Sequence, residues 1–332
     1  METPLLTLTD RGLYCPPGDF YIDPWRRVER AVITHGHGDH ARSGMGHYWT
    51  ATPGVPLLRK RLGGYSPVEG LAYGEPRAFG PVTVSLHPAG HILGSAQVRV
   101  AYGGEVWVVT GDFKREADPT CAPFESVPCD VLITEATFAY PVYQWPDPSQ
   151  VIREIYDWWQ ACAAEGRAAL LYTYALGKAQ RILAGLADYS TTPVWLHGAM
   201  EGLTQIYRDA GVCMIPTTPV SAQARSDAGA GRLILAPPSA AGSKWAKRFR
   251  GAETGFASGW MQIRGTRRRK GYDVGFVLSD HADWPGLIRT IEDSGARRVL
   301  ATHGYTDALL AYLKDRGIDA AALATPYGEE EA

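Results

Sequence analysis

Short apolar runs separated by turn residues fill the first part of the chain. Residues 31–33 are a continuous apolar run, and residues 82–86 alternate between apolar and polar side chains. Residues 96–109 are divided by a glycine pair at 103–104. These patterns predict a buried strand, a half-buried strand and a β-hairpin. Residues 5–33 contain further apolar runs and turns, and should supply the first strands of a sheet.

The middle of the chain has a different pattern, typical of alternating strands and helices. Asp147 can cap a helix that has Pro148 in its first turn. Four apolar residues then share one face of that helix: Ile152, Ile155, Tyr156 and Trp159. Because a proline- and aromatic-rich stretch, 140–148, comes first, we expect a domain boundary there. Three strands are also predicted, over residues 168–172, 194–198 and 232–236.

The composition is that of a soluble globular protein, with 332 residues, 45% of them hydrophobic and 20% charged. This length allows two domains, or one large domain with an insertion. We expect no membrane segment and no signal peptide, since neither apolar pattern is present. The five cysteines form no CxxC pair, so reduced thiols and a cytoplasmic location are expected. The net charge of −2 argues against a protein that coats nucleic acid, but not against a local basic patch.

A group of metal-ligand residue types lies just past the apolar run 31–33. It consists of His35, His37, Asp39 and His40. Glycines between them allow a tight turn, so these side chains can converge. Imidazole and carboxylate groups bind Zn²⁺ and Mn²⁺, and four of them can serve two ions. The alternative is a histidine-rich surface turn, but the HxHxDH spacing favours a metal site. We expect Asp39 and His40 to begin a short helix. A preceding aspartate, Asp23, could support a metal ligand, but the pattern favours a turn residue before proline.

The HxHxDH motif resembles the signature of the metallo-β-lactamase superfamily of binuclear metallohydrolases. The resemblance implies a four-layer αββα fold with the metal ions at one edge of a β-sandwich. It does not imply a substrate, because this fold carries many activities. His91 matches the superfamily histidine that completes the first metal site, whereas His87 is not expected to be a ligand. Asp112, which follows a strand and a glycine, resembles the bridging aspartate.

Three further residues lie at or after predicted strands and indicate one group within the superfamily. Glu135 is the carboxylate near the end of a predicted buried strand within 130–138, while His281 and His303 follow the apolar runs 274–278 and 298–301. In this order they resemble the three motifs of the β-CASP group, whose members process nucleic acids. RNase J and the mRNA 3′-end cleavage endonuclease keep the last histidine, which Artemis-type nucleases generally lack. With its short segment after His303, the chain most resembles the bacterial ligase-associated DNA damage response exonucleases.

The resemblance covers nearly the whole chain and implies its domain organisation. The fold class is α/β, an αββα metallo-β-lactamase sandwich with an inserted α/β β-CASP domain. We expect residues 1–145 and 270–332 to form the sandwich, and residues 146–269 to form the insert.

The resemblance also implies two divalent metal ions, Zn or Mn, and a ligand set. The first ion would take His35, His37, His91 and Asp112, and the second Asp39, His40, Asp112 and His303. Water between the ions would be acidic enough to exist as hydroxide near neutral pH. His281 would donate a proton to the leaving oxygen, and Glu135 would orient His281. Asp39, Glu135 and His281 are the expected catalytic residues.

Three segments of the predicted insert could hold a phosphate group. The first is a helix N-terminus with a nearby lysine, although an ordinary βα turn has the same pattern. The second is a turn, rich in small and hydroxyl residues, after the strand at 232–236. The third is the densest charge run, 264–270, which is either a solvated loop or a track for a phosphate backbone. In that order, the candidate residues are Gly177 and Lys178, Ser243 and Lys244, and Arg267 and Arg268.

We therefore expect a 5′→3′ exonuclease that acts on single-stranded DNA in repair, with a functional link to a DNA ligase. A β-CASP ribonuclease with the same site is the main alternative, and a 2′-hydroxyl contact would decide between them. A small-molecule hydrolase of the superfamily fits less well, because it does not account for Glu135, His281 and His303. A non-enzymatic scaffold also fits less well, because degenerate members lose the metal ligands that this chain keeps.

Overall fold

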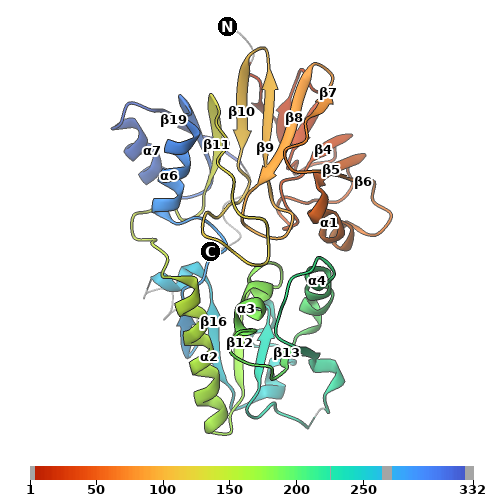
Figure 1. Ribbon diagram of the computed structural model, residues 1–332, viewed down its shortest axis with the longest axis vertical. Coiled ribbons are helices and arrows are strands. Elements are labelled where there is room, and N and C mark those ends of the chain that lie inside the picture. Colours follow the sequence, from red (N-terminus) through yellow and green to blue (C-terminus); the bar gives the residue numbers. More distant parts are fainter. Residues whose placement is uncertain (1–3, 225, 264–270, 326–332) are drawn as a thin grey trace. The chain divides into compact units, whose positions relative to one another are not determined.

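The chain divides into two compact units, which the computed structural model describes over residues 4–224, 226–263 and 271–325 (Figure 1). One unit is Met1–Gln144 together with His281–Ala332, and the other is Trp145–Asp280. Among the described residues, no helix is both long and apolar enough to cross a membrane.

The first unit contains two β-sheets. The first sheet has six strands in the order β1 to β6: Thr7–Leu8, Leu13–Cys15, Phe20–Ile22, Arg30–Val32, His47–Ala51 and Val68–Leu71. The second has seven strands in the order β19-β18-β11-β10-β9-β8-β7. From β7 to β11 these are Arg77–Phe79, Val82–Pro88, Ala96–Tyr102, Glu105–Val109 and Val131–Ala136; β18 is Arg298–Gly304 and β19 is Asp319–Ala322. The expected hairpin is present, with Tyr102 paired to Glu105.

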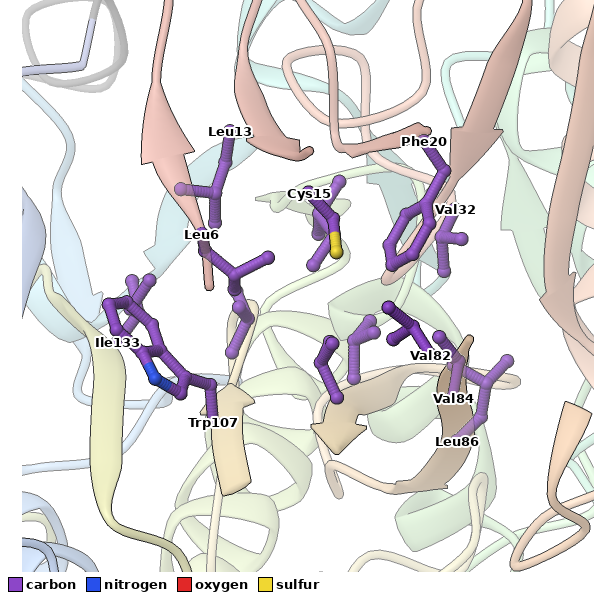
Figure 2. Close-up of a cluster of buried hydrophobic side chains, with 14 of the residues drawn as sticks. Leu6, Leu13, Cys15, Phe20, Val32, Val82, Val84, Leu86, Trp107 and Ile133 are labelled. Atoms are coloured by element: carbon purple, nitrogen blue, oxygen red, sulfur yellow. The ribbon is translucent and has the colours of Figure 1, made fainter. Parts of the chain in front are cut away.

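The two sheets enclose the main hydrophobic core of this unit. This core includes Phe20 and Val32 of the first sheet and Trp107 of the second (Figure 2). Val82 and Val84, alternate residues of β8, are fully buried in it. The period of two therefore directs one face of each strand inward, as the alternation in the sequence predicts.

Helices cover the outer faces of both sheets. The helix α1 (Val55–Leu62), preceded by the 3₁₀ turn η1 (Thr52–Gly54), packs on the first sheet. The second sheet is covered by α6 (Trp284–Ser294) and α7 (Thr306–Lys314). The layers are therefore helix, sheet, sheet and helix.

The second unit is built on a six-stranded parallel sheet in the order β14-β13-β15-β12-β16-β17. In sequence order, β12 to β17 are Ala169–Tyr172, Val194–Leu196, Thr217–Pro219, Leu233–Ala236, Glu253–Ala257 and Val274–Phe276. The helices α2 (Pro148–Ala164), α3 (Lys178–Leu186) and α4 (Gly198–Asp209) pack on one face. Four 3₁₀ turns pack on the other: Val220–Ala222, Pro238–Ala240, Ala246–Phe249 and Gly259–Gln262. Asp147 caps α2 as predicted, accepting a hydrogen bond from the Ser149 amide at 2.8 Å.

Two local expectations are wrong. Residues 274–276 were expected to open the last part of the first domain, but this strand pairs with β16 in the third sheet. The second unit consequently extends to Asp280 rather than to residue 269. A short apolar run predicts a strand, but nothing local in it specifies the neighbouring strand. Asp39 and His40 lie in a turn rather than at the start of a helix, closed by a hydrogen bond from the Ala41 amide to the His37 carbonyl.

Candidate metal centre

The predicted metal ligands come from the ends of strands in both sheets of the first unit. The strands β10, β11 and β18 are mutually parallel, so their carboxyl ends share one edge of the second sheet. Asp112 follows β10, whereas Glu135 and His303 lie near the ends of β11 and β18. The pairing of β11 with β18 shifts register between Glu135 and Ala136, a bulge of the kind that redirects side chains beside functional sites.

A first group of ligand atoms converges on one point. His35, His37, His91 and Asp112 each offer a ligand atom, and these atoms lie within 4.8 Å of one another. The Nδ1 atom of His37 is 3.1 Å from Nε2 of His35 and 3.0 Å from Nε2 of His91. Ring nitrogens this close repel one another through their lone pairs unless a proton or a cation lies between them. The donor set therefore fits a metal ion.

A second group lies beside the first, and Asp112 reaches both. Asp39, His40 and His303 form this group, in which the rings of His40 and His303 are stacked with centroids 5.0 Å apart. Asp112 Oδ2 is 3.4 Å from His35 Nε2, whereas Asp112 Oδ1 is 3.5 Å from His40 Nε2. The two oxygens of one carboxylate thus face different ligand groups, which is the arrangement that two ions sharing a carboxylate would need.

The electrostatics of the centre favour neutral rings at His35 and His303 and a positive charge at His40. Burial lowers the pKa of His35 well below its usual value, and lowers the pKa of His303 to about 4. Both rings therefore offer lone pairs near neutral pH. Burial also acts to lower the pKa of His40, but the carboxylates of Asp112 and Asp23 outweigh it and raise that pKa well above its usual value. Two carboxylates at this point attract a cation.

Asp23, for which a turn role was expected over a role beside the metal ligands, contacts this centre. Its Oδ2 atom is 2.7 Å from His40 Nδ1 and accepts a 2.6 Å hydrogen bond from the Thr34 hydroxyl. The Thr34 amide donates to its other oxygen at 2.8 Å. Asp23 therefore orients His40 rather than only forming a turn before Pro24. Its backbone is left-handed, with φ 44°.

We expect Asp23→Asn to weaken metal binding without unfolding the chain. Losing the carboxylate that fixes and polarises a ligating imidazole typically costs ~10–100-fold in metal affinity. The matched control is Asp19→Asn, because Asp19 also has a left-handed backbone, with φ 49°, but its side chain contacts Tyr14. Metal titration followed by calorimetry measures the difference. Equal metal affinity for the two variants would show that Asp23 has no such role.

Glu135 and His281 form a third, overlapping group with Asp112. The Nδ1 atom of His281 is 2.8 Å from Glu135 Oε2. Because an ionised carboxylate only accepts hydrogen bonds, this contact assigns the hydrogen to Nδ1 in the neutral ring and directs Nε2 elsewhere. Glu135 also accepts hydrogen bonds from the Phe113 amide at 2.7 Å and the Thr137 hydroxyl at 2.6 Å. Burial raises the pKa of Glu135, and the hydrogen bonds from His281 and Thr137 oppose that shift.

The expected phosphate contact at Gly177 and Lys178 is not supported by their surroundings. Lys178 is only 3% exposed, and its Nζ atom is 3.4 Å from Asp280 Oδ2. Arg181 Nη1 is 3.5 Å from the other oxygen of Asp280. The Gly177 amide donates to Gln180 Oε1 at 2.8 Å and is buried. The lysine charge is therefore balanced inside the second unit, because Asp280 lies against α3, and we do not retain Gly177 and Lys178 as phosphate ligands.

We expect Lys178→Met to destabilise the protein by roughly 3–5 kcal/mol, because it removes one partner of a buried ion group. Since Arg181 still pairs with Asp280 in this variant, the loss should lie near the lower of these figures. Lys244→Met is the control, because Lys244 is exposed. Chemical denaturation measures both. Unchanged stability of Lys178→Met, together with weaker oligonucleotide binding, would restore the phosphate role.

Of the other candidate phosphate-binding residues, two are accessible to a ligand and two lie outside the described part of the chain. Lys244 is exposed, and Ser243 is half-buried with its hydroxyl accepting a 3.3 Å hydrogen bond from the Ala246 amide. Both remain available to a ligand. Arg267 and Arg268 lie outside the described residues.

Comparison with known proteins supports the resemblance that the motifs indicate. No family model matches the chain. A protein named "Probable DNA ligase" from Opitutus terrae is 31% identical over 94% of this chain and 30% of that protein. An "Endoribonuclease ysh1" from Emericella nidulans is 30% identical over 38% of this chain and 14% of that protein. An "RNase J-like protein" from Methanocaldococcus jannaschii is 27% identical over 42% of this chain and 35% of that protein.

The chain spans about a third or less of the length of these relatives. Among solved structures, a protein of unknown function from Enterococcus faecalis V583 matches with a TM-score of 0.61 and 12% identity, over 90% of this chain and 80% of that one. At this identity the likeness shows the fold alone, which is a mixed α/β fold. The named homologues include β-CASP members, so the resemblance seen in the sequence is confirmed, and the chain belongs to the β-CASP nuclease family.

Proposed function

We propose that this chain is a binuclear metal-dependent phosphodiesterase that removes nucleotides from single-stranded DNA in the 5′→3′ direction during DNA repair. The observation that carries the proposal is the Asp112 carboxylate, whose two oxygens face two separate groups of ligand atoms. The β-CASP family is metal-dependent, and its named homologues here include nucleases. A phosphodiester is a natural substrate for paired ions, because both the attacking and the leaving oxygen need stabilisation.

We also propose that the first unit is the αββα metallo-β-lactamase sandwich and that the second is the β-CASP insert. The helix, sheet, sheet and helix layers of the first unit support this assignment. Chain connectivity supports it too, because residues 145–280 interrupt the first unit. We place the activity in the cytoplasm, since all five cysteines are free thiols.

The chain would hold one ion through His35, His37, His91 and Asp112, and the other through Asp39, His40, Asp112 and His303. All of these ligands are imidazoles or carboxylates and none is a thiolate, a set that suits zinc and manganese. When bound, two such ions supply Lewis-acid chemistry that acidifies water and withdraws charge from phosphate oxygens.

His281 supplies the proton that the leaving oxygen needs. Its Nδ1–H is held by Glu135, which leaves Nε2 to carry the transferable proton. Its ring lies beside that of His91, with centroids 4.8 Å apart, so it is next to the first ligand group. Glu135 is fixed by an amide and a hydroxyl, and therefore acts as a positioning residue for the imidazole. General acid catalysis by a positioned histidine accelerates such steps by ~10²–10⁴-fold.

The choice of DNA rests on one relative. The Opitutus terrae protein that matches nearly the whole chain is named a probable DNA ligase, and we infer a functional link to DNA end joining. A ribonuclease is the second candidate, because two of the relatives bear endoribonuclease or RNase names. The DNA proposal is preferred because those matches cover less than half of the chain.

One assay separates these activities. The purified chain is incubated with Mn²⁺ or Zn²⁺ and single-stranded DNA or RNA of one sequence, labelled at either end. The proposal expects mononucleotides from the 5′ end of DNA, and faster cleavage when that end carries a phosphate. Preferential cleavage of RNA would favour the ribonuclease. Release from the 3′ end first would reverse the polarity, and no cleavage of either polymer would refute the nuclease activity.

A further inference from the structure

A pocket in the first unit adjoins the turn that carries the metal motif. It has a volume of about 420 Å³, and its lining includes Gly38. Gly38 lies between His37 and Asp39, which are both predicted ligands. A ligand in the pocket would therefore lie against the same short turn that presents the metal ligands. Its volume falls within the ~300–1,000 Å³ typical of small-ligand sites.

The lining of this pocket is strongly basic. Arg26, Arg27, Arg42 and Arg61 contribute to it, and none of the described acidic side chains does. The net charge of the whole chain is −2, so this concentration of positive charge is local. The four arginines come from three separate segments of the chain. Four arginines that line one pocket repel one another, and this positive charge favours an anion among them.

The arginine charges are only partly balanced by neighbouring carboxylates. Arg26 pairs with Asp10 at 3.0 Å, but both side chains are more than 60% exposed, so water screens the pair. No carboxylate in the described part of the chain lies within ion-pair distance of Arg27 or Arg61. Asp39 acts on the charge of Arg61 from farther away.

Arg61 brings this positive charge up to the metal motif. A Cβ atom added at Gly38 would overlap the Arg61 guanidinium, so this side chain lies directly on the turn. Arg61 is in the last turn of α1, next to Lys60, which does not line the pocket. Trp25 also lines the pocket, so an aromatic residue lies beside the arginines. Proteins that bind single-stranded nucleic acid combine positive charge, which contacts the phosphates, with aromatic residues, on which bases stack.

We propose that this arginine pocket binds a phosphate group of the nucleic-acid strand, next to the phosphate that is cleaved. The inference rests on the proposed nuclease function and names a binding site for its substrate. The phosphate can be an internal one of the backbone or the terminal one, since both present the same oxygens to guanidinium groups.

The test compares Arg61→Gln with Lys60→Gln. The two residues are neighbours on α1 and each substitution removes one positive charge, but only Arg61 lines the pocket. The double variant Arg27→Gln/Arg42→Gln removes two exposed arginines and does not disturb the contact with Gly38. Binding to the metal-loaded full chain is followed by fluorescence anisotropy. The probe is a single-stranded 2′-O-methyl phosphorothioate oligonucleotide, which resists hydrolysis and keeps its charges. Thermal melting checks that each variant is folded.

We expect both arginine variants to bind more weakly than Lys60→Gln. On a single strand, each lost phosphate contact lowers the salt slope by about 0.7, which is about fivefold in affinity at 0.1 M salt. A loss seen only with a 5′-phosphorylated probe identifies the terminal phosphate, and a loss with every probe identifies the backbone. Affinities and slopes equal to those of Lys60→Gln in both variants would overturn the proposal.

Two further results are informative. One distinguishes a phosphate-binding pocket from a protein-binding pocket, and the other separates failure of the pocket proposal from failure of the proposed nuclease activity. If the variants lose affinity for a labelled polyglutamate peptide but not for the oligonucleotide, the pocket binds protein and the proposal is wrong. If the unaltered chain cleaves no unmodified strand but binds the probe through these arginines, the pocket stands and the proposed nuclease activity fails.

Discussion

Asp112→Ala should remove nearly all hydrolytic activity and at least one of two bound metal ions. Asp112 is the only side chain whose oxygens face both ligand groups among the described residues. Its loss leaves five imidazoles and Asp39 to hold two divalent ions, with one carboxylate fewer to balance their charge. Paired ions contribute several kcal/mol of charge stabilisation, so the rate should fall by at least ~10³-fold. Elemental analysis and a nuclease assay on the same sample measure both effects.

Asp118→Ala is the control for Asp112→Ala. Asp118 is 7% exposed and Asp112 is 6% exposed, so the two are similarly buried. Asp118, however, accepts hydrogen bonds from the Thr120 amide and hydroxyl. It should retain both ions and its activity if it remains folded. An Asp112→Ala protein with two ions and undiminished activity would contradict the shared-carboxylate arrangement.

His281→Ala should retain both metal ions and lose ~10²–10⁴-fold in rate. The ring is held by Glu135, and His281 belongs neither to the group of His35, His37 and His91 nor to that of Asp39, His40 and His303. The loss should shrink on a nitrophenyl phosphodiester, because its leaving group departs without a proton. Glu135→Gln should show the same pattern more weakly, since Glu135 only orients the imidazole. Rates on both leaving groups are measured together with metal content.

His87→Ala is the matched control, because His87 contacts Ser85 and Glu125 and belongs to none of the ligand groups. Two results would reassign His281. Loss of a metal ion in His281→Ala would make it a ligand, which its place beside Asp112 and Glu135 allows. An equal rate loss on both leaving groups would mean that it holds the phosphate rather than protonating the leaving oxygen.

The candidate ligand residues, which the structure brings together, could be singled out from the sequence because their signal is local. The motif at 35–40 concentrates four ligand groups after one strand, and the other ligands each follow an apolar run. Strand ends at one sheet edge bring such residues together, as the parallel pairing of β10, β11 and β18 does. The residue types and their order therefore carry the information, and the structure adds the distances.

The missed features depend on contacts between distant parts of the chain. Asp23 before Pro24 has the local pattern of a turn, so the sequence ranked its role beside the metal ligands second, and its contact with His40 is visible only in three dimensions. Lys178 at a helix start suggests an exposed cation, but it pairs with Asp280, which is about a hundred residues later in the sequence. The arginine pocket likewise gathers separate segments, each of which alone has the pattern of an ordinary solvated charge. Local patterns carry no signal for such pairings.

The most direct test of the two-ion centre is a metal titration of the metal-free chain. Zn²⁺ or Mn²⁺ is added in steps, and bound metal and hydrolysis of a single-stranded DNA are measured on each sample. Two ligand groups sharing Asp112 predict that activity rises to its maximum only as the bound metal reaches two ions per chain. Full activity at one bound ion per chain would contradict the two-ion centre.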